Sequence, residues 1–168
     1  VTGIHVHIGS GVDMGHLAQV AGATAAFARI AGPAVKRISA GGGLSTPYRE
    51  DDPEIDVTAY YEIWDTERRG LEEQFGHPVE LEIEPGRFLV AEAGYLLCEI
   101  RAIKQMGKNT FYLVDAGFNN LARPILYGAY HPISIAPTDG STNERGLQDV
   151  VVGGPLCESG DIFTQEEG

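Results

Sequence analysis

The sequence predicts an α/β part followed by a β part: the C-terminal part of a (β/α)8 barrel and then a mainly antiparallel β domain. Up to residue 91, short apolar runs alternate with long segments of helical period, which is typical of βαβ units in a parallel sheet or barrel. From residue 92 onward the apolar runs are separated by turn residues, and helical periodicity is nearly lost. The change of period therefore divides the chain into residues 1–91 and 92–168.

A strand over residues 3–8 and a long helix after it form the first βα unit. The run "GIHVHI" has the composition of a strand, and Asp13 is a residue type that caps helices. Gly32 and Pro33 end the helix. One face of this helix is predicted to be apolar, with one polar member, and consists of Leu17, Val20, Ala21, Thr24, Phe27 and Ala28.

Two further strands are predicted at residues 35–39 and 79–83, with a second long helix between them. Asp56 is its expected N-cap, and Gly76 and Pro78 end it. Its apolar positions are Tyr60, Ile63, Trp64, Leu71 and Phe75. Since three strands cannot close a barrel, we expect the missing strands to precede Val1 and the chain to hold the last three βα units.

The second half is predicted to hold four strands and one short helix. The strands lie in "YLLCEIRAI", "TFYLVDA", "HPISIA" and "DVVVGG", at residues 95–103, 110–116, 131–136 and 149–154. The helix candidate is "NLARPILYG", residues 120–128. Turn residues between the runs favour antiparallel pairing.

Composition excludes several classes of partner. The 168 residues carry a net charge of −12, which argues against nucleic acid and against an anionic membrane, because both bind basic surfaces. No apolar run has the length that crosses a bilayer, and "VTGIHVHIGSG" is unlike the start of a secretory signal. Cys98 and Cys157 form no disulfide framework, so we expect a soluble protein of a reducing compartment, the cytoplasm.

Each of the first three strands is followed by a segment suited to binding an anion. The segments are "HIGSG", "AGGGLS" and "EPGRF". Ligands gather at the carboxyl ends of parallel strands, and glycine lets backbone N–H groups approach an anion closely. Ser10 adds a hydroxyl group and Arg87 a planar cation. Three such loops at corresponding strand ends predict a phosphate site, although a single glycine run is more often only a turn.

His5 and His7 project from the same face of their strand, because strand side chains alternate. They could be packed histidines, or the zinc ligands of a metal-dependent barrel hydrolase, but Glu84 is the only further ligand candidate in the later loops. We therefore favour His7 as a flat ring packed on a flat cofactor, and no metal. Glu84 either forms a structural salt bridge or holds a proton on a heteroaromatic ring nitrogen of that cofactor.

The stretch "VVVGGPLCESGDIF" places Cys157 on a loop, because turn residues flank it on both sides. A structural cysteine would more often lie in the core. Glu158 follows at once and Asp161 comes three residues later, so the loop carries a thiol and two acids.

Five segments in this order resemble the pyridoxal-phosphate-dependent decarboxylases of the alanine-racemase-type barrel fold: "GIHVHIGSG", "SAGGGLS", "EIEPGRF", "LVDAGFNNLARPILYGAYH" and "GGPLCESGD". The resemblance covers nearly the whole chain and is strongest to the members that act on diaminopimelate. It implies pyridoxal 5'-phosphate as cofactor and decarboxylation of meso-2,6-diaminopimelate to L-lysine. A related decarboxylase of another diamino or basic amino acid is the alternative, and so is a catalytically inactive paralogue.

The same resemblance implies a role for each motif residue. The cofactor would be bound by His7, Ser10, Gly43, Glu84, Pro85, Gly86 and Arg87. The carboxylates of the substrate would be bound by Arg87, Arg123 and Tyr127, and its distal amino group by Glu158. Cys157 would be the catalytic acid that protonates carbon after carbon dioxide has left. The resemblance also implies a head-to-tail homodimer in which this cysteine loop reaches the partner's site.

One part of the family pattern is missing from the chain. Such enzymes join the cofactor to a lysine, and the lysines here are Lys36, Lys104 and Lys108. Lys36 lies at the wrong end of its predicted strand, and the other two flank a turn of the β domain. We therefore expect this chain alone to be inactive and to hold most of a site without its covalent anchor.

Overall fold

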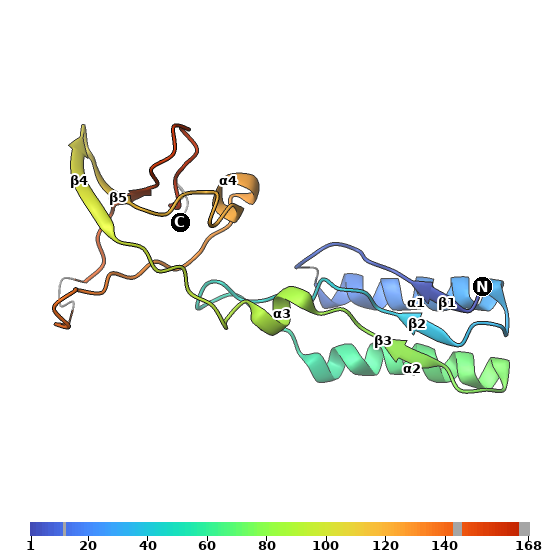
Figure 1. Ribbon diagram of the computed structural model, residues 1–168. Helices are drawn as coiled ribbons and strands as arrows, with labels where there is room; N and C mark the ends of the chain where they lie inside the picture. The colour runs from blue at the N-terminus through green and yellow to red at the C-terminus, as the bar shows by residue number, and fades with distance from the viewer. Residues whose placement is uncertain (12, 143–145, 165–168) are drawn as a thin grey trace. The chain divides into compact units, whose positions relative to one another are not determined.

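The computed structural model describes residues 1–11, 13–142 and 146–164. The chain forms two compact units, Val1–Gly94 and Tyr95–Gly168, and each is described by itself (Figure 1).

The first unit is a βαβαβ arrangement. Its sheet has the parallel strands β1 (Gly3–His5), β2 (Arg37–Ser39) and β3 (Glu80–Glu82), in that order. Two long crossover helices, α1 (Met14–Ala31) and α2 (Val57–Phe75), connect them and pack side by side (Figure 1). The strand and helix order predicted for the first half is therefore confirmed, although each strand is only three residues long.

The predicted helix ends are also confirmed. The Asp13 carboxylate accepts the N–H groups of Gly15 and His16, and Asp56 caps the start of α2 in the same way. At the other end of α2, Gly76 adopts the left-handed conformation (φ 74°), and its N–H donates to the Glu72 carbonyl. Local side-chain chemistry thus fixes where both helices begin and where α2 ends.

The core of this unit lies between the two helices and the sheet. The buried side of α1 consists mainly of small residues, and α2 contributes the large side chains of Trp64 and Leu71. Ile38 of β2 is fully buried in the same cluster. Full burial of each such large apolar side chain contributes about 1.5–3 kcal/mol.

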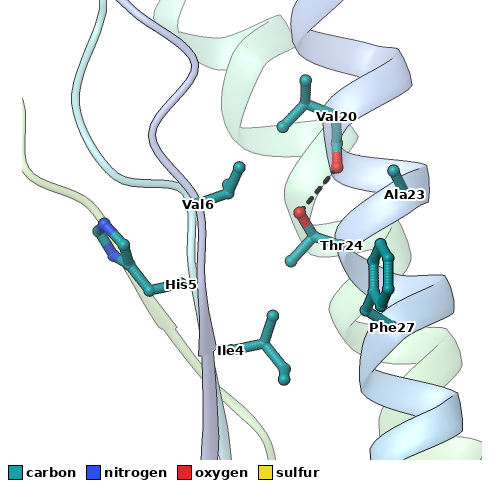
Figure 2. A pocket seen from close by; sticks show the side chains of 7 residues that line it. All are labelled: Ile4, His5, Val6, Val20, Ala23, Thr24 and Phe27. Carbon is teal, nitrogen blue, oxygen red and sulfur yellow. Dashed lines mark hydrogen bonds between the residues drawn. The ribbon is translucent and has the colours of Figure 1, made fainter.

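Phe27 was expected on the buried face of α1 and is 65% exposed, so this prediction was wrong. The buried stripe runs through Leu17, Ala21, Thr24 and Ala28, and Phe27 lies at its margin. There Phe27 lines an apolar groove of about 390 Å³ between α1 and β1 (Figure 2). The helical period thus correctly predicted a buried stripe along α1 but wrongly included Phe27 in it.

The second unit has a small mixed sheet. β4 (Ile100–Met106) pairs antiparallel with β5 (Asn109–Val114), which pairs in parallel with β6 (Val151–Gly153). The short helix α4 (Arg123–Tyr127) follows β5. A β domain is therefore present, and six of its nine paired positions are antiparallel, while the pairing of β5 with β6 is parallel and was not predicted.

The strand expected at residues 131–136 is absent from the described residues. Pro132 and Pro137 enclose the apolar alternation, and proline lacks the N–H group that a sheet needs. Residues 95–99 also precede β4 rather than belong to it. Conversely, the short helix α3 (Gly86–Val90) was not predicted. In the part of the chain that the structure describes, no helix is long and apolar enough to cross a membrane.

An ion-pair network ties α2 to the entrance of β3. The Arg68 guanidinium contacts Asp65 (2.6 Å) and Glu72 (2.6 Å), and the Glu72 carboxylate accepts the Val79 N–H (2.9 Å). The hydrogen bond from Arg68 lowers the pKa of Asp65, and the Val79 N–H, followed by Arg68, lowers that of Glu72.

This network predicts a specific loss of stability in acid. A carboxylate whose pKa is lowered by folding stabilises the folded state fully above its unfolded pKa, 3.8 for Asp65, and the stabilisation is lost as the pH falls through the folded value. We expect Asp65→Asn to be less stable at neutral pH and to lose less further stability below pH ~4. Thermal melting of the full-length protein from pH 7 to pH 3 measures this.

Glu54→Gln, at an exposed carboxylate in the loop before α2, is the matched control and should leave the pH profile of wild type unchanged. Equal acid sensitivity of Asp65→Asn and wild type would contradict the role of the network.

Candidate functional site

The segments after β1, β2 and β3 meet at the carboxyl ends of the strands. The Gly11 N–H donates to the Gly43 carbonyl (3.0 Å), which joins the first segment to the second. The Glu84 N–H donates to the Gly41 carbonyl (2.8 Å), which joins the third to the second. The three loops that the sequence places over one site are therefore connected by backbone hydrogen bonds.

Two glycines of the middle segment are required by this close approach. Gly41 (φ 64°) and Gly43 (φ 107°) have positive φ values, which strain other residues. A Cβ at Gly41 would overlap the Val6 carbonyl, and one at Gly43 would overlap the Gly9 carbonyl. Only a chain without side chains at both positions can pack here.

His7 is held at the edge of these loops. Its Nδ1 accepts the Gly42 N–H (3.2 Å), so a neutral ring carries its proton on Nε2. The residue is exposed, and a Cβ at Gly42 would lie 3.2 Å from its Cε1. The ring is thus oriented by the backbone while remaining accessible to a ligand.

His5 connects the first two strands to Glu84. Its Nδ1 lies 3.0 Å from Ser39 Oγ, and its Nε2 lies 3.9 Å from a Glu84 carboxylate oxygen. Figure 2 shows its ring pointing away from α1, opposite to Ile4 and Val6. The sequence offered His5 only as a packed residue or metal ligand, and this orienting contact was missed. Among the described residues, no group of three metal-binding side chains occurs.

Arg87 lies beside the loops with an unused donor. Its Nε is buried without a hydrogen-bond partner among the described residues, and its guanidinium carbon lies 5.9 Å from the centre of the Tyr48 ring. A buried donor of this kind is costly unless something accepts its hydrogen. Together with the glycine loops, it forms an arrangement that suits an anion.

The remaining predicted residues of this unit are arranged less directly. Ser10, Glu84 and Gly86 are exposed, and Pro85 is half-buried at the start of α3. The Gly86 N–H donates to the Glu84 carbonyl (2.9 Å), so in this structure it is engaged within its own turn.

In the second unit, Arg123 and Tyr127 are the first and last residues of α4. Arg123 Nη1 lies 3.4 Å from Nε2 of His131, a residue that the sequence did not single out. Burial, and to a lesser degree Arg123, lowers the pKa of His131, so the imidazole is neutral at neutral pH. Tyr127 is 75% exposed, which leaves its hydroxyl accessible.

Cys157 and Glu158 lie on a loop closed at its base by a bridge between Gly153 and Ile162. Both are exposed, and the Glu158 carboxylate accepts the Ser159 hydroxyl (3.1 Å) and the Gly160 N–H (3.3 Å). The expected loop cysteine is therefore confirmed. Cys98 is half-buried, and burial raises the pKa of its thiol.

The first unit thus has glycine loops and an arginine at parallel strand ends, and the second has an exposed thiol next to an exposed acid. The family model described as "Pyridoxal-dependent decarboxylase, C-terminal sheet domain" matches residues 13–167. The chain belongs to this family of pyridoxal-dependent decarboxylases.

Relatives are similar along the whole chain. Diaminopimelate decarboxylase of Streptomyces coelicolor is 56% identical, and that of Escherichia coli K12 is 53% identical, each over 100% of this chain. The chain spans 38% and 40% of these relatives' lengths. A crystal structure of diaminopimelate decarboxylase is similar with a TM-score of 0.93 and 53% identity, over 98% of this chain and 39% of that one. A crystal structure of diaminopimelate decarboxylase from Helicobacter pylori in complex with L-lysine has a TM-score of 0.82 and 30% identity, over 98% of this chain and 39% of that one.

The close approach of Gly43 to the Gly9 carbonyl predicts that a side chain at position 43 destabilises the fold by steric overlap. A control variant can separate this overlap from the cost of a positive φ. Gly43→Ala and Gly76→Ala both place alanine at positive φ, which costs about 1 kcal/mol of unfolding free energy. Only at Gly43 does the new methyl group also overlap a backbone carbonyl; around Gly76 there is open space. We expect a clearly larger loss for Gly43→Ala in urea denaturation of the full-length protein. Equal losses would show that the loops do not pack as described.

Proposed function

We propose that the chain is part of a diaminopimelate decarboxylase, which converts meso-2,6-diaminopimelate to L-lysine and carbon dioxide. Identity of 53–56% to curated enzymes of that name, along the whole chain, carries this proposal. In the proposed protein, residues 1–91 are the last three βα units of the cofactor-binding barrel. Residues 92–168 belong to its C-terminal β domain.

The loops of the first unit fit pyridoxal 5'-phosphate. Its phosphate suits the cradle of Ser10, Gly43 and the Glu84–Arg87 segment, where the buried Arg87 Nε has no other acceptor among the described residues. The exposed His7 ring offers a flat surface to the cofactor ring, and Glu84 offers a carboxylate to a protonated ring nitrogen. When bound, the cofactor accepts the electron pair that remains when carbon dioxide leaves.

The second unit supplies contacts to a substrate with two carboxylates and two amino groups. Arg123 would bind a carboxylate, since a guanidinium matches a carboxylate in a bidentate manner, and the Tyr127 hydroxyl would donate to one. Arg87 of the first unit would bind a carboxylate in the same bidentate way. Glu158 would bind the distal ammonium group. The Cys157 thiol would hold the proton that is delivered to the substrate carbon.

None of the lysines of this chain is placed to anchor the cofactor in the proposed site. Lys36 precedes β2 and so lies at the end of the sheet opposite to the loops, and Lys104 and Lys108 belong to the region of β4 and its turn in the other unit. The lysine that anchors the cofactor is therefore proposed to lie outside these residues. We further propose a cytoplasmic homodimer in which the Cys157 loop completes the partner's site.

The function is tested by assaying the full-length protein, loaded with pyridoxal phosphate, for carbon dioxide and L-lysine. L-Ornithine and L-arginine serve as competing substrates. We expect meso-diaminopimelate to be preferred, and Glu158→Ala to lower its kcat/KM about 30-fold or more, as loss of one partner of a desolvated charge pair costs at least ~2 kcal/mol.

Cofactor absorbance provides the control, because Glu158→Ala should leave cofactor binding unchanged. Preference for ornithine or arginine would favour the alternative of a related decarboxylase. An unaltered kcat/KM in Glu158→Ala would contradict the proposed contact between Glu158 and the distal amine.

Cys157→Ala should separate binding from protonation. The thiol acts after carbon dioxide has left, so cofactor absorbance and substrate binding should persist while kcat falls by about 10²-fold or more. Stopped-flow absorbance and steady-state product formation measure the two stages.

Cys98→Ala, at the half-buried cysteine of the same unit, is the matched control and should retain kcat. If Cys157→Ala instead loses its cofactor absorbance, the cysteine is structural.

A further inference from the structure

Asp161 is a buried acid that the proposed chemistry leaves without a role. It is 4% exposed, although aspartate is rarely buried without a partner. Its Oδ1 accepts the Phe118 N–H and its Oδ2 accepts the Leu156 N–H, both at 2.7 Å. Such short hydrogen bonds to a carboxylate are strong. Both partners are main-chain groups, so the carboxylate fixes the course of the chain rather than orienting another side chain.

The two amides belong to the two segments that carry the proposed substrate contacts of this unit. Leu156 directly precedes Cys157 and Glu158. Phe118 belongs to the turn before α4, in which the Gly117 carbonyl accepts the N–H groups of Asn120 (2.9 Å) and Leu121 (3.3 Å). One carboxylate therefore joins the cysteine loop to the turn that leads into Arg123.

The main chain of Asp161 closes the loop on itself. Its carbonyl accepts the Gly154 N–H (2.8 Å), and its N–H donates to the Glu158 carbonyl (3.1 Å). Asp161 thus holds the start of the loop at Gly154 and, within the loop, the backbone at Glu158. Movement of Asp161 would carry Cys157 and Glu158 with it.

Glycines make room for the carboxylate and for the helix. A Cβ at Gly154 would overlap Asp161 Oδ2, and one at Gly117 would lie 3.0 Å from Oδ1. A Cβ at Gly160 would overlap Ile125 Cδ1, so the loop also rests directly against α4. The carboxylate and this contact together leave little freedom between loop and helix.

We propose that Asp161 is a positioning residue that holds the loop of Cys157 and Glu158 in a fixed position against α4 and the turn before it, so that the loop is presented rigidly to the site that it completes. The proposal rests on the proposed function. Asp161 is buried and its carboxylate accepts main-chain N–H groups, so it acts through the main chain of the two segments. Displacement of a reacting group by about 1 Å can cost ~10²-fold in rate, so a fixed loop position has a direct catalytic consequence.

The test is Asp161→Asn in the full-length protein loaded with pyridoxal phosphate. Asparagine has the same shape, but its NH₂ group faces one of the two N–H donors, so one hydrogen bond is lost and two donors are opposed. Asp139→Asn is the control, since Asp139 also accepts a turn amide, that of Ser141 (2.9 Å), but is exposed and away from the loop. The readouts are cofactor absorbance, kcat and KM for meso-diaminopimelate, and the rate of alkylation of Cys157 by iodoacetamide relative to Cys98.

We expect Asp161→Asn to keep its cofactor absorbance, to lose roughly tenfold or more in kcat per loaded site, and to alkylate Cys157 about threefold faster. Cys157 is exposed in the single chain but would be covered in the proposed dimer, and a loosened loop would leave the partner's site more often. Asp139→Asn should match wild type in all three. Wild-type kcat and alkylation in folded Asp161→Asn would overturn the proposal, even if its melting temperature falls. If wild type itself fails to decarboxylate diaminopimelate, the proposed function fails, while the alkylation rates still decide the role of Asp161.

Should Asp161→Asn not fold, Gly160→Ala takes its place. It keeps the carboxylate, but its methyl group would overlap Ile125 Cδ1, so the loop or the Ile125 side chain must shift. A loss of kcat with intact cofactor absorbance supports the fixed position of the loop against α4. Wild-type kcat and alkylation in this variant overturn it.

Discussion

The first unit depends on a backbone that carries no side chains at Gly41 and Gly43. Their positive φ values and the carbonyls of Val6 and Gly9 leave no space for a Cβ. Because of this, the loops after the three strands approach closely enough to hydrogen-bond, and their amides gather at one edge of the sheet. His7 is oriented by the same stretch through the Gly42 N–H. If these loops bind a ligand as proposed, hydrogen-bonded backbone of this kind would already be organised before the ligand binds.

The second unit reaches a similar order by a different means. Its apolar core is small, with Val114, Ala116, Val152 and Phe163 as the buried members. A core of this size gives limited hydrophobic stabilisation, so polar ties must hold the loops that leave the sheet. The buried Asp161 carboxylate provides such a tie, because it binds the N–H groups of both Phe118, 43 residues earlier in the sequence, and Leu156, five residues earlier. The loops of the first unit are thus fixed by backbone hydrogen bonds at glycines, and those of the second unit by a buried carboxylate.

Features set by neighbours in sequence were the ones that could be predicted. The caps at Asp13 and Asp56 and the stop at Gly76 depend on local hydrogen bonds and φ, so the sequence contains them. Pairing across the chain is different: the alternation at 131–136 looked like a strand but has no partner strand among the described residues. The contacts of His5 with Ser39 and of Arg123 with His131 likewise depend on strand register and on turns, which no local pattern specifies.

Arg87 differs from most other arginines of this acidic chain in its surroundings. With a net charge of −12, arginines readily find carboxylates, and the described ion pairs include Arg29–Glu67, Arg37–Glu82, Arg68–Asp65 and Arg101–Glu99. Arg87 instead lies beside the Tyr48 ring, and its buried Nε has no acceptor among the described residues. An aromatic face supports a cation without neutralising it. Among the described ion pairs none includes Arg87, so its positive charge would be available to an anion next to the glycine loops.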